Sequence, residues 1–383
     1  HGALRAWWVK RMVESPRQLQ EKLALFWHGH FAVQFSVVGH TYALYRQNQL
    51  FREHAAGNFG ALLYGIVHDP AMLKYLDNNR NVKGKPNENL ARELMELFAM
   101  GVDQGYTQKD IVEGARALTG YTADPVDGLF RFAHEQHDRG EKVIFGRKGP
   151  WTGDDFVKLI LEQPATSRFI AGKLFAYFAQ QEPDREAVEK LAAVLRANTF
   201  ELAPMLKNLF LSEKFYAPDV TGTQIKSPVQ LVIGTLKDLG IAKLSDYGAV
   251  DQALREMGQE LLEPPDVKGW RYGRSWITSA RVLTRYNRVA SLVRSAPRPG
   301  APAGADVTSL LDAKACGSPE EIVEALVRAF LIPPLPAEKR GELVGALSGL
   351  PPCGSWAARK EEVNAKLRNV LVLLMSTPEY QMF

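Results

Sequence analysis

Cysteine is nearly absent from this chain of 383 residues, which contains two, Cys316 and Cys353. Two cysteines are too few for a disulfide-stapled scaffold or for a zinc cluster. In an oxidising compartment they can form one bridge, and buried free thiols are the alternative elsewhere. Cysteine chemistry is therefore not expected to carry the function.

An excess of charge of one sign is also missing. The sequence has 47 basic and 43 acidic residues, a net charge of +4, and the two signs are interleaved. Without a basic stripe, nucleic acid is not an expected partner. Long apolar runs are absent as well, because the best candidate, "FIAGKLFAYFA", is too short to span a membrane and contains Lys173. Neither nucleic-acid binding nor a membrane span is expected.

Several familiar catalytic signatures do not occur. The sequence contains no serine or cysteine nucleophile motif, no Walker loop, no dinucleotide-binding fingerprint and no His-Glu-x-x-His pair. What it does contain is ordinary for a globular protein, with 46% hydrophobic residues, enough for a large core. The function has to be sought in less stereotyped clusters of residues.

Apolar residues recur at helical spacing over most of the chain. The predicted helices cover about 2–13, 16–29, 41–55, 58–67, 70–76, 87–100, 108–118, 153–162, 167–180, 184–197, 202–212, 226–238, 249–258, 277–294, 319–331, 336–347 and 358–376. The exception is 121–150, where alternating and apolar stretches flank Asp138-Arg139-Gly140 and predict a hairpin. We expect a mainly α protein, a multi-helical bundle-like body with one small β-hairpin.

A stretch rich in Pro, Gly and Ala suggests how the chain is divided. It covers 295–305, "SAPRPGAPAGA", and is typical of a linker. We therefore predict a main helical domain over 1–294, with the hairpin at about 121–150, and a short helical C-terminal segment over 306–383 that packs on the main body.

The segment "PNENLARELMELFAMG", residues 86–101, gathers polar groups on one helix face. Glu93 lies four residues from Asn89, and Glu96 lies four from Arg92, so each pair can touch. Two neighbouring carboxyl groups of this kind suit acid/base chemistry or cation binding. The alternative is a solvated face with an ordinary Arg92–Glu96 ion pair.

The following segments repeat and extend this pattern. The next predicted helix opens with "YTQKD", a capping box, and carries Glu113 and Arg116. The predicted hairpin turn then supplies His137 and Asp138, with Lys142 opposite, as candidates for substrate binding. The alternative is turn chemistry, in which Asp138 bonds its own backbone.

The stretch "FWHGHF" places His28 and His30 on either side of Gly29, at the end of a predicted helix. Residues two apart do not face each other on a helix. A shared metal site therefore requires Gly29 to break the helix, so that the extended chain turns both rings to one face. Otherwise one histidine is buried and bonded to the backbone while the other is exposed.

Residues 258–287 lack helical periodicity until about 277 and contain Trp270 and Trp276. Long loops with aromatic rings, glycine and arginine suit stacking against sugar rings or other planar groups. The alternative is that both tryptophans fill the core.

Taken together, these motifs resemble one bacterial family, the domain family of unknown function DUF1800. The resemblance rests on "FWHGHF", "NENLARELMELFAMG", "YTQKDIVEGARALTGY", "HDRGEKVIFG", "QPATSRFIAGKLFAYF", "SEKFY", "EPPDVKGWRYGRSWI" and "STPEYQ". It implies export to the periplasm or the outside of the cell, and a start truncated relative to members with an export signal. The matching motif residues are His28, His30, Asn87, Glu88, Asn89, Arg92, Glu93, Glu96, His137, Asp138 and Lys142.

Three hypotheses of different classes follow. The first, which we favour, is an exported hydrolase acting on a glycan, because glycoside hydrolysis needs two carboxyl groups and aromatic platforms. Its predicted catalytic residues are Glu93, Glu96, Glu113 and Arg92. Its predicted substrate-binding residues are Asn87, Glu88, Asn89, His137, Asp138, Lys142, Trp270 and Trp276.

The second hypothesis is a metal-dependent enzyme that holds a divalent metal through His28, His30, His137 and Asp138. The third is a non-catalytic helical module that assembles with another exported protein. For any single site, the motif segments have to converge in the fold, although they are far apart in the sequence.

Overall fold

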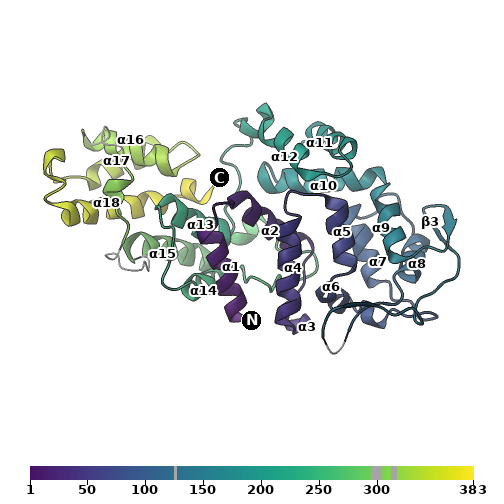
Figure 1. The fold of residues 1–383 in the computed structure, drawn as a ribbon. Helices are drawn as coiled ribbons and strands as arrows, with labels where there is room; N and C mark the ends of the chain where they lie inside the picture. The colour runs from purple at the N-terminus through teal and green to yellow at the C-terminus, as the bar shows by residue number, and fades with distance from the viewer. Residues whose placement is uncertain (125–126, 296–303, 312–316) are drawn as a thin grey trace. The chain divides into compact units, whose positions relative to one another are not determined.

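The computed structural model describes residues 1–124, 127–295, 304–311 and 317–383, and helices dominate it (Figure 1). By contacts the chain divides into two compact units. Unit 1 comprises His1, 17–215 and 262–270, and unit 2 comprises 2–16, 216–261 and 271–383. The two units do not coincide with the predicted division between 1–294 and 306–383, because segments of the two units alternate along the chain. Most of the predicted linker, 296–303, and Cys316 lie outside the described residues.

Unit 1 contains the helices that carry the predicted site. They are α2 (Gln18–His30), α3 (Phe35–Val38), α4 (Thr41–Glu53), α5 (Phe59–Val67), α6 (Pro70–Tyr75), α7 (Asn89–Glu93), the π-helix η2 (Leu94–Ala99), α8 (Gln108–Ala117), α9 (Gly153–Leu161), α10 (Pro164–Phe178), α11 (Arg185–Ala197) and α12 (Leu202–Phe210), with the short helical turn η1 (Asn78–Arg80).

In the described part of unit 2, all the named secondary-structure elements are helices or helical turns. Its helices are α1 (Gly2–Glu14), α13 (Pro228–Asp238), α14 (Gly248–Glu256), α15 (Ser279–Ser295), α16 (Pro319–Phe330), α17 (Ala337–Ala346) and α18 (Lys360–Met375), with the short turns η4 (Gly273–Trp276), η5 (Val307–Ser309), η7 (Cys353–Ser355) and η8 (Pro378–Gln381). The turn η3 (Glu213–Tyr216) lies where the chain leaves unit 1.

The mainly α prediction is confirmed, and local chemistry explains why. Several helices begin at a side chain that accepts a backbone N–H of the first turn, as Asp69 does for α6 and Thr152 does for α9. The capping box predicted in "YTQKD" is present at α8, where Thr107 and Asp110 bond each other's backbone. Sequence reasoning missed α3, which is only four residues long.

The β structure differs from the single predicted hairpin. Strand β1 (Tyr121–Ala123) pairs with β2 (Phe130–Phe132), and β3 (Lys142–Ile144) pairs with β4 (Arg147–Gly149), both antiparallel. The two flanks of Asp138-Arg139-Gly140 therefore pair with other partners and not with each other, so this prediction is wrong in its pairing. The segment between β2 and β3 is held by side chains of α8 instead.

Large aromatic side chains form the core of unit 1. Trp27, Phe31, Phe51, Phe59 and Phe98 are fully buried, and the ring centroids of Phe31 and Phe98 lie 5.2 Å apart. These rings join α2, α4, α5 and the π-helix η2, and their burial supplies much of the hydrophobic stabilisation. Within the described residues, no helix has the length and apolar character needed to cross a membrane.

Candidate functional site

The helix predicted over 87–100, called the acidic helix below, begins as the α-helix α7 and continues as the π-helix η2. After α7 ends at Glu93, the backbone N–H of Met100 reaches the carbonyl of Met95, five residues back. π-Helices are rare in proteins, and those that do occur are often found at functional sites. Near this helix end the carbonyl of Phe98 accepts a hydrogen bond from His30 Nε2, at 2.8 Å. The helix that bears Glu93 and Glu96 is thereby fixed to α2.

Arg92 organises the exposed part of the acidic face. Its guanidinium donates to Glu96 Oε1 at 3.2 Å, to Glu88 Oε2 at 2.8 Å and to Gln108 Oε1 at 3.0 Å. Gln108 in turn donates to the same oxygen of Glu88, which links α7 to α8. Glu96 and Glu88 are therefore the charged partners of one arginine. Of the other predicted residues nearby, Asn89 is exposed, and Asn87 accepts the backbone N–H of Asn89.

Glu93 has a different environment although it lies only three residues from Glu96. It is half-buried, and its Oε2 atom is shielded from solvent with no hydrogen-bond partner among the described residues. Burial raises the pKa of Glu93, the charge of Glu96 raises it further, and Arg92 and Lys268 oppose this rise. The two neighbouring carboxyl groups therefore have different environments. That of Glu93 is shifted towards the protonated form, and that of Glu96 is held in an ion pair with Arg92.

Side chains from two further segments of unit 1 interact electrostatically with Glu93. Tyr75, at the end of α6, donates its hydroxyl to Gln34 Oε1 at 3.0 Å. Burial raises the pKa of Tyr75 to about 12, and the charges of Asp266, Glu263 and Glu93 add to the rise. Lys268, which acts on Glu93, lies in the same loop as Asp266 and Glu263. The loop 262–270 and the acidic helix therefore approach each other, as the predicted convergence requires.

The histidine pair belongs to the structural support of this region. Helix α2 continues through Gly29 to His30, so the break that a shared metal site needs is absent. His28 Nε2 accepts the backbone N–H of Leu262 at 3.2 Å, while His30 bonds the carbonyl of Phe98. Both rings are almost completely buried, and burial lowers both pKa values, that of His28 to about 3.

The metal prediction finds no support in this geometry. His28 and His30 bond backbone groups of two different segments, and no cluster of three His, Cys, Asp or Glu side chains that could hold a metal ion occurs in the part of the chain that the structure describes. His137 is also bonded to the backbone, through Nδ1 and the carbonyl of Thr119 at 2.8 Å.

The second polar cluster, on α8, holds the segment between the two hairpins. Glu113 accepts from Arg116 at 2.9 Å and from the backbone N–H of Val143 at 2.9 Å. Arg116 also donates to Asp138 at 2.8 Å, and Asp138 accepts the N–H of Gly140. This is the turn chemistry considered as the alternative, and it commits Glu113 to positioning β3.

Lys142 also belongs to that cluster, through hydrogen bonds to the backbone around Asp138. Its side chain is fully buried and donates to the carbonyls of Asp138, at 2.5 Å, and Gly140, at 3.0 Å. Across the described residues, no hydrogen bond or ion pair joins Glu113, Asp138 or Lys142 to Glu93 or Glu96. The structure brings Arg92, Glu93 and Glu96 together and leaves the α8 cluster as a separate, structural group.

Both tryptophans of the long loop are core residues. Trp270 is 5% exposed and its ring lies 5.3 Å from that of His28, within unit 1. Trp276 is 2% exposed and lies in η4 of unit 2. Rings buried to this degree present no face to a sugar, which contradicts their predicted role as stacking platforms.

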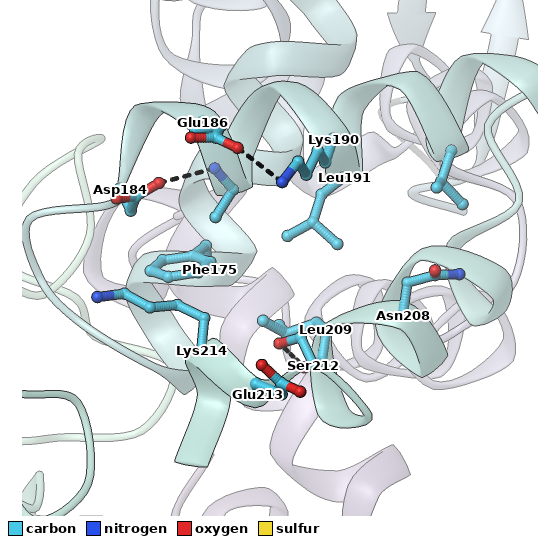
Figure 2. A pocket seen from close by; sticks show the side chains of 12 residues that line it. Phe175, Asp184, Glu186, Lys190, Leu191, Asn208, Leu209, Ser212, Glu213 and Lys214 are labelled. Atoms are coloured by element: carbon cyan, nitrogen blue, oxygen red, sulfur yellow. Dashed lines mark hydrogen bonds and ion pairs between the residues drawn. The ribbon is translucent and has the colours of Figure 1, made fainter. Parts of the chain in front are cut away.

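A pocket that sequence reasoning did not find lies elsewhere in unit 1, between α10, α11 and α12 (Figure 2). It has a volume of about 450 Å³ and is lined both by apolar residues, such as Phe175 and Leu191, and by charged residues. Two of these charged residues, Glu186 and Lys190, pair with each other at 2.7 Å. The pocket contains none of the predicted site residues, and its polar groups are those of an ordinary helix surface.

The fold and the site define a helical protein in which an α-helix that continues as a π-helix bears two carboxyl groups, Glu93 with a raised pKa and Glu96 in an ion pair. The chain belongs to the DUF1800 family, described as "Protein of unknown function", whose family model matches residues 1–382. No curated protein and no solved structure matches the chain.

Proposed function

We propose that the protein is a hydrolase that cleaves a glycan by general acid/base catalysis, with Glu93 as the acid and Glu96 as the base. One observation carries the proposal: Glu93 has a raised pKa and an unpartnered, shielded oxygen, while its neighbour Glu96 is bound to Arg92. Pairs of titratable groups with environments that separate their pKa values are typical of acid/base sites.

The proposed reaction needs only groups of this helix and water. The protonated Glu93 donates its proton to the glycosidic oxygen, and the bond from that oxygen to the anomeric carbon breaks. The carboxylate of Glu96 takes a proton from the water that attacks the anomeric carbon, and exchange with solvent restores both groups. Arg92 holds Glu96 in place through the bond to Oε1.

A glycan is the proposed substrate because hydrolysis of a glycosidic bond requires two carboxyl groups and no cofactor. The exposed Asn89 and the half-exposed Glu88 and Arg92 border the carboxyl pair and provide donors and acceptors for hydroxyl groups. The proposed place of action is outside the cytoplasm, which the family resemblance suggests, and the proposed partner is a cell-envelope polysaccharide.

Release of reducing ends from purified peptidoglycan and from soluble glucans tests this function. We expect Glu93→Gln to lower the rate by about 10²–10⁴-fold, the usual contribution of a general acid. Glu189→Gln is the matched control, because Glu189 is an exposed acid of another helix, α11, where it pairs with Arg168 and with none of the proposed site residues. Wild-type rates that survive in Glu93→Gln would rule out the assigned acid, and rates that collapse in EDTA would favour a metal-dependent reaction.

A further inference from the structure

Unit 2 contains a second pocket, lined mainly by apolar side chains. It has a volume of about 280 Å³ and is lined by residues of α15, of the segment before α13 and of the C-terminal turn η8. Ile225, Ile277, Val282 and Met382 supply apolar walls. This volume lies just below the roughly 300–1,000 Å³ of typical ligand pockets and suits a small organic ligand.

A buried guanidinium forms part of the same lining. Arg285 on α15 is 1% exposed. Its Nε donates to Gln381 Oε1 at 2.8 Å and its Nη2 to the carbonyl of Lys226 at 2.8 Å, while Nη1 has no acceptor among the described residues. Burial lowers the pKa of Arg285 to about 10, so the group stays charged at neutral pH. No carboxylate of the described residues forms an ion pair with it, which is rare for a buried charge.

Gln381 offers a second unused donor in the pocket. Its amide orientation is fixed, because Oε1 has to accept from Arg285 Nε. The Nε2 atom is consequently left without an acceptor among the described residues, although Gln381 is 5% exposed. Arg285 Nη1 and Gln381 Nε2 are thus two buried donor nitrogens without acceptors, on side chains bonded to each other. Such an arrangement costs stability unless an acceptor binds there.

The surrounding charges also favour an anion. Lys226 lies over the ring of Tyr380, 4.0 Å from its centroid, and burial lowers the pKa of Lys226 to about 8, helped by the charge of Arg285. The nearby Asp238 opposes this shift and accepts a hydrogen bond from Tyr380 at 3.1 Å. Lys226 therefore has Asp238 as its acidic neighbour, whereas Arg285 has no carboxylate partner among the described residues.

We propose that this pocket binds a carboxylate attached to an apolar body, with the carboxylate bonded to Arg285 Nη1 and Gln381 Nε2 and the apolar body against Ile225, Ile277 and Val282. Both nitrogens are shielded from solvent, so a lining side chain has to move for the carboxylate to reach them. Met382 is suited to this because its unbranched side chain adapts easily. The ligand is a medium-chain fatty acid or the C-terminal residue of a peptide.

Calorimetric titration of the full chain with octanoate and with N-acetyl-leucine tests the proposal, and the tighter of the two identifies the source of the carboxylate. 1-Octanol, which has the apolar body without the charge, is the control ligand. We expect Arg285→Met to weaken binding of the carboxylate at least about tenfold, the effect of one lost charge-assisted hydrogen bond. Arg288→Met, on the same helix but in an exposed pair with Glu256, keeps wild-type affinity.

Two further variants keep the test valid if Arg285→Met does not fold. Ile277→Trp places a large ring in the lining and abolishes binding, whereas Leu283→Trp, at an exposed position of α15, does not. The proposal is overturned if neither carboxylate binds, if 1-octanol binds as tightly as octanoate, or if Ile277→Trp binds like the wild type.

Discussion

The carbonyl oxygen of Gly29 lies where a side chain of Gly269 would begin. A Cβ atom at Gly269 would be 1.9 Å from that oxygen, and the backbone at Gly269 has a φ of +74°. The loop 262–270 therefore presses its backbone directly on helix α2, between the contacts that His28 makes with Leu262 and Trp270. This close approach fixes the loop, which includes Lys268, on α2, the helix whose His30 also bonds the carbonyl of Phe98.

The first prediction is that Gly269→Ala destabilises the protein by on the order of 3 kcal/mol or more. A left-handed backbone costs a residue with a side chain about 1–2 kcal/mol, and the collision with Gly29 adds to that cost. Urea unfolding measures the loss. Gly84→Ala is the control, since its φ is +80° but nothing lies within 4 Å of the added Cβ. Equal losses in the two variants would show that the close approach is absent.

The second prediction concerns the histidine pair. His30→Phe keeps the ring but leaves the carbonyl of Phe98 without its donor, which costs about 1–3 kcal/mol of unfolding free energy. The exposed His134→Phe is the control and changes stability little. Thermal melts of the wild type with and without EDTA complete the test. A fall in melting temperature on chelation would contradict the assignment of both histidines to backbone contacts.

Local signals account for what the sequence predicted well. The capping box of Thr107 and Asp110 needs only four consecutive residues, and the helical stripes need only one face each. The turn chemistry of Asp138 and Gly140 was also recognisable. The pairing of the strands was not, because it depends on two side chains of α8, Glu113, which accepts the N–H of Val143 in β3, and Asp110, which accepts the N–H of Phe145 just after β3.

The site was harder to predict because its contacts span long distances in the chain. His30 bonds a carbonyl 68 positions away, and His28 accepts from an N–H 234 positions away. Neither partner is marked by residue type, since both are backbone groups. The change from α-helix to π-helix after Glu93 leaves no pattern in the sequence either.

The third prediction concerns Asp69, which is 5% exposed at the start of α6. Burial raises its pKa to about 7, well above the ordinary 3.8. Its stabilising contribution is therefore present below about pH 4 and is lost as the pH rises through 7, where the buried group has to ionise. Asp69→Asn removes this loss, so the variant should exceed the wild type at pH 8, by on the order of a few kcal/mol, and match it near pH 4.

Asparagine is suitable because the hydrogen bonds that Asp69 accepts from Met72 N–H and from Gln47 go to the same oxygen, which the amide retains. Melting curves at both pH values check the prediction. An advantage of the variant that is the same at pH 4 and pH 8 would mean that Asp69 ionises normally.

The last prediction tests whether the acidic face serves chemistry or stability. The pKa of Glu93 is raised above the ordinary 4.5, so its contribution to stability is present below that value and is lost as the pH rises through the raised one. Glu93→Gln should therefore melt at or above the wild type at pH 8 and lose that advantage at pH 4. Glu96→Gln removes one partner of a partly exposed arginine and should cost less than about 1 kcal/mol, because Glu88 still binds Arg92. A large fall in melting temperature for both variants at pH 8 would contradict the catalytic proposal, because it would make the two carboxyl groups structural partners of Arg92, as expected of a helical assembly module.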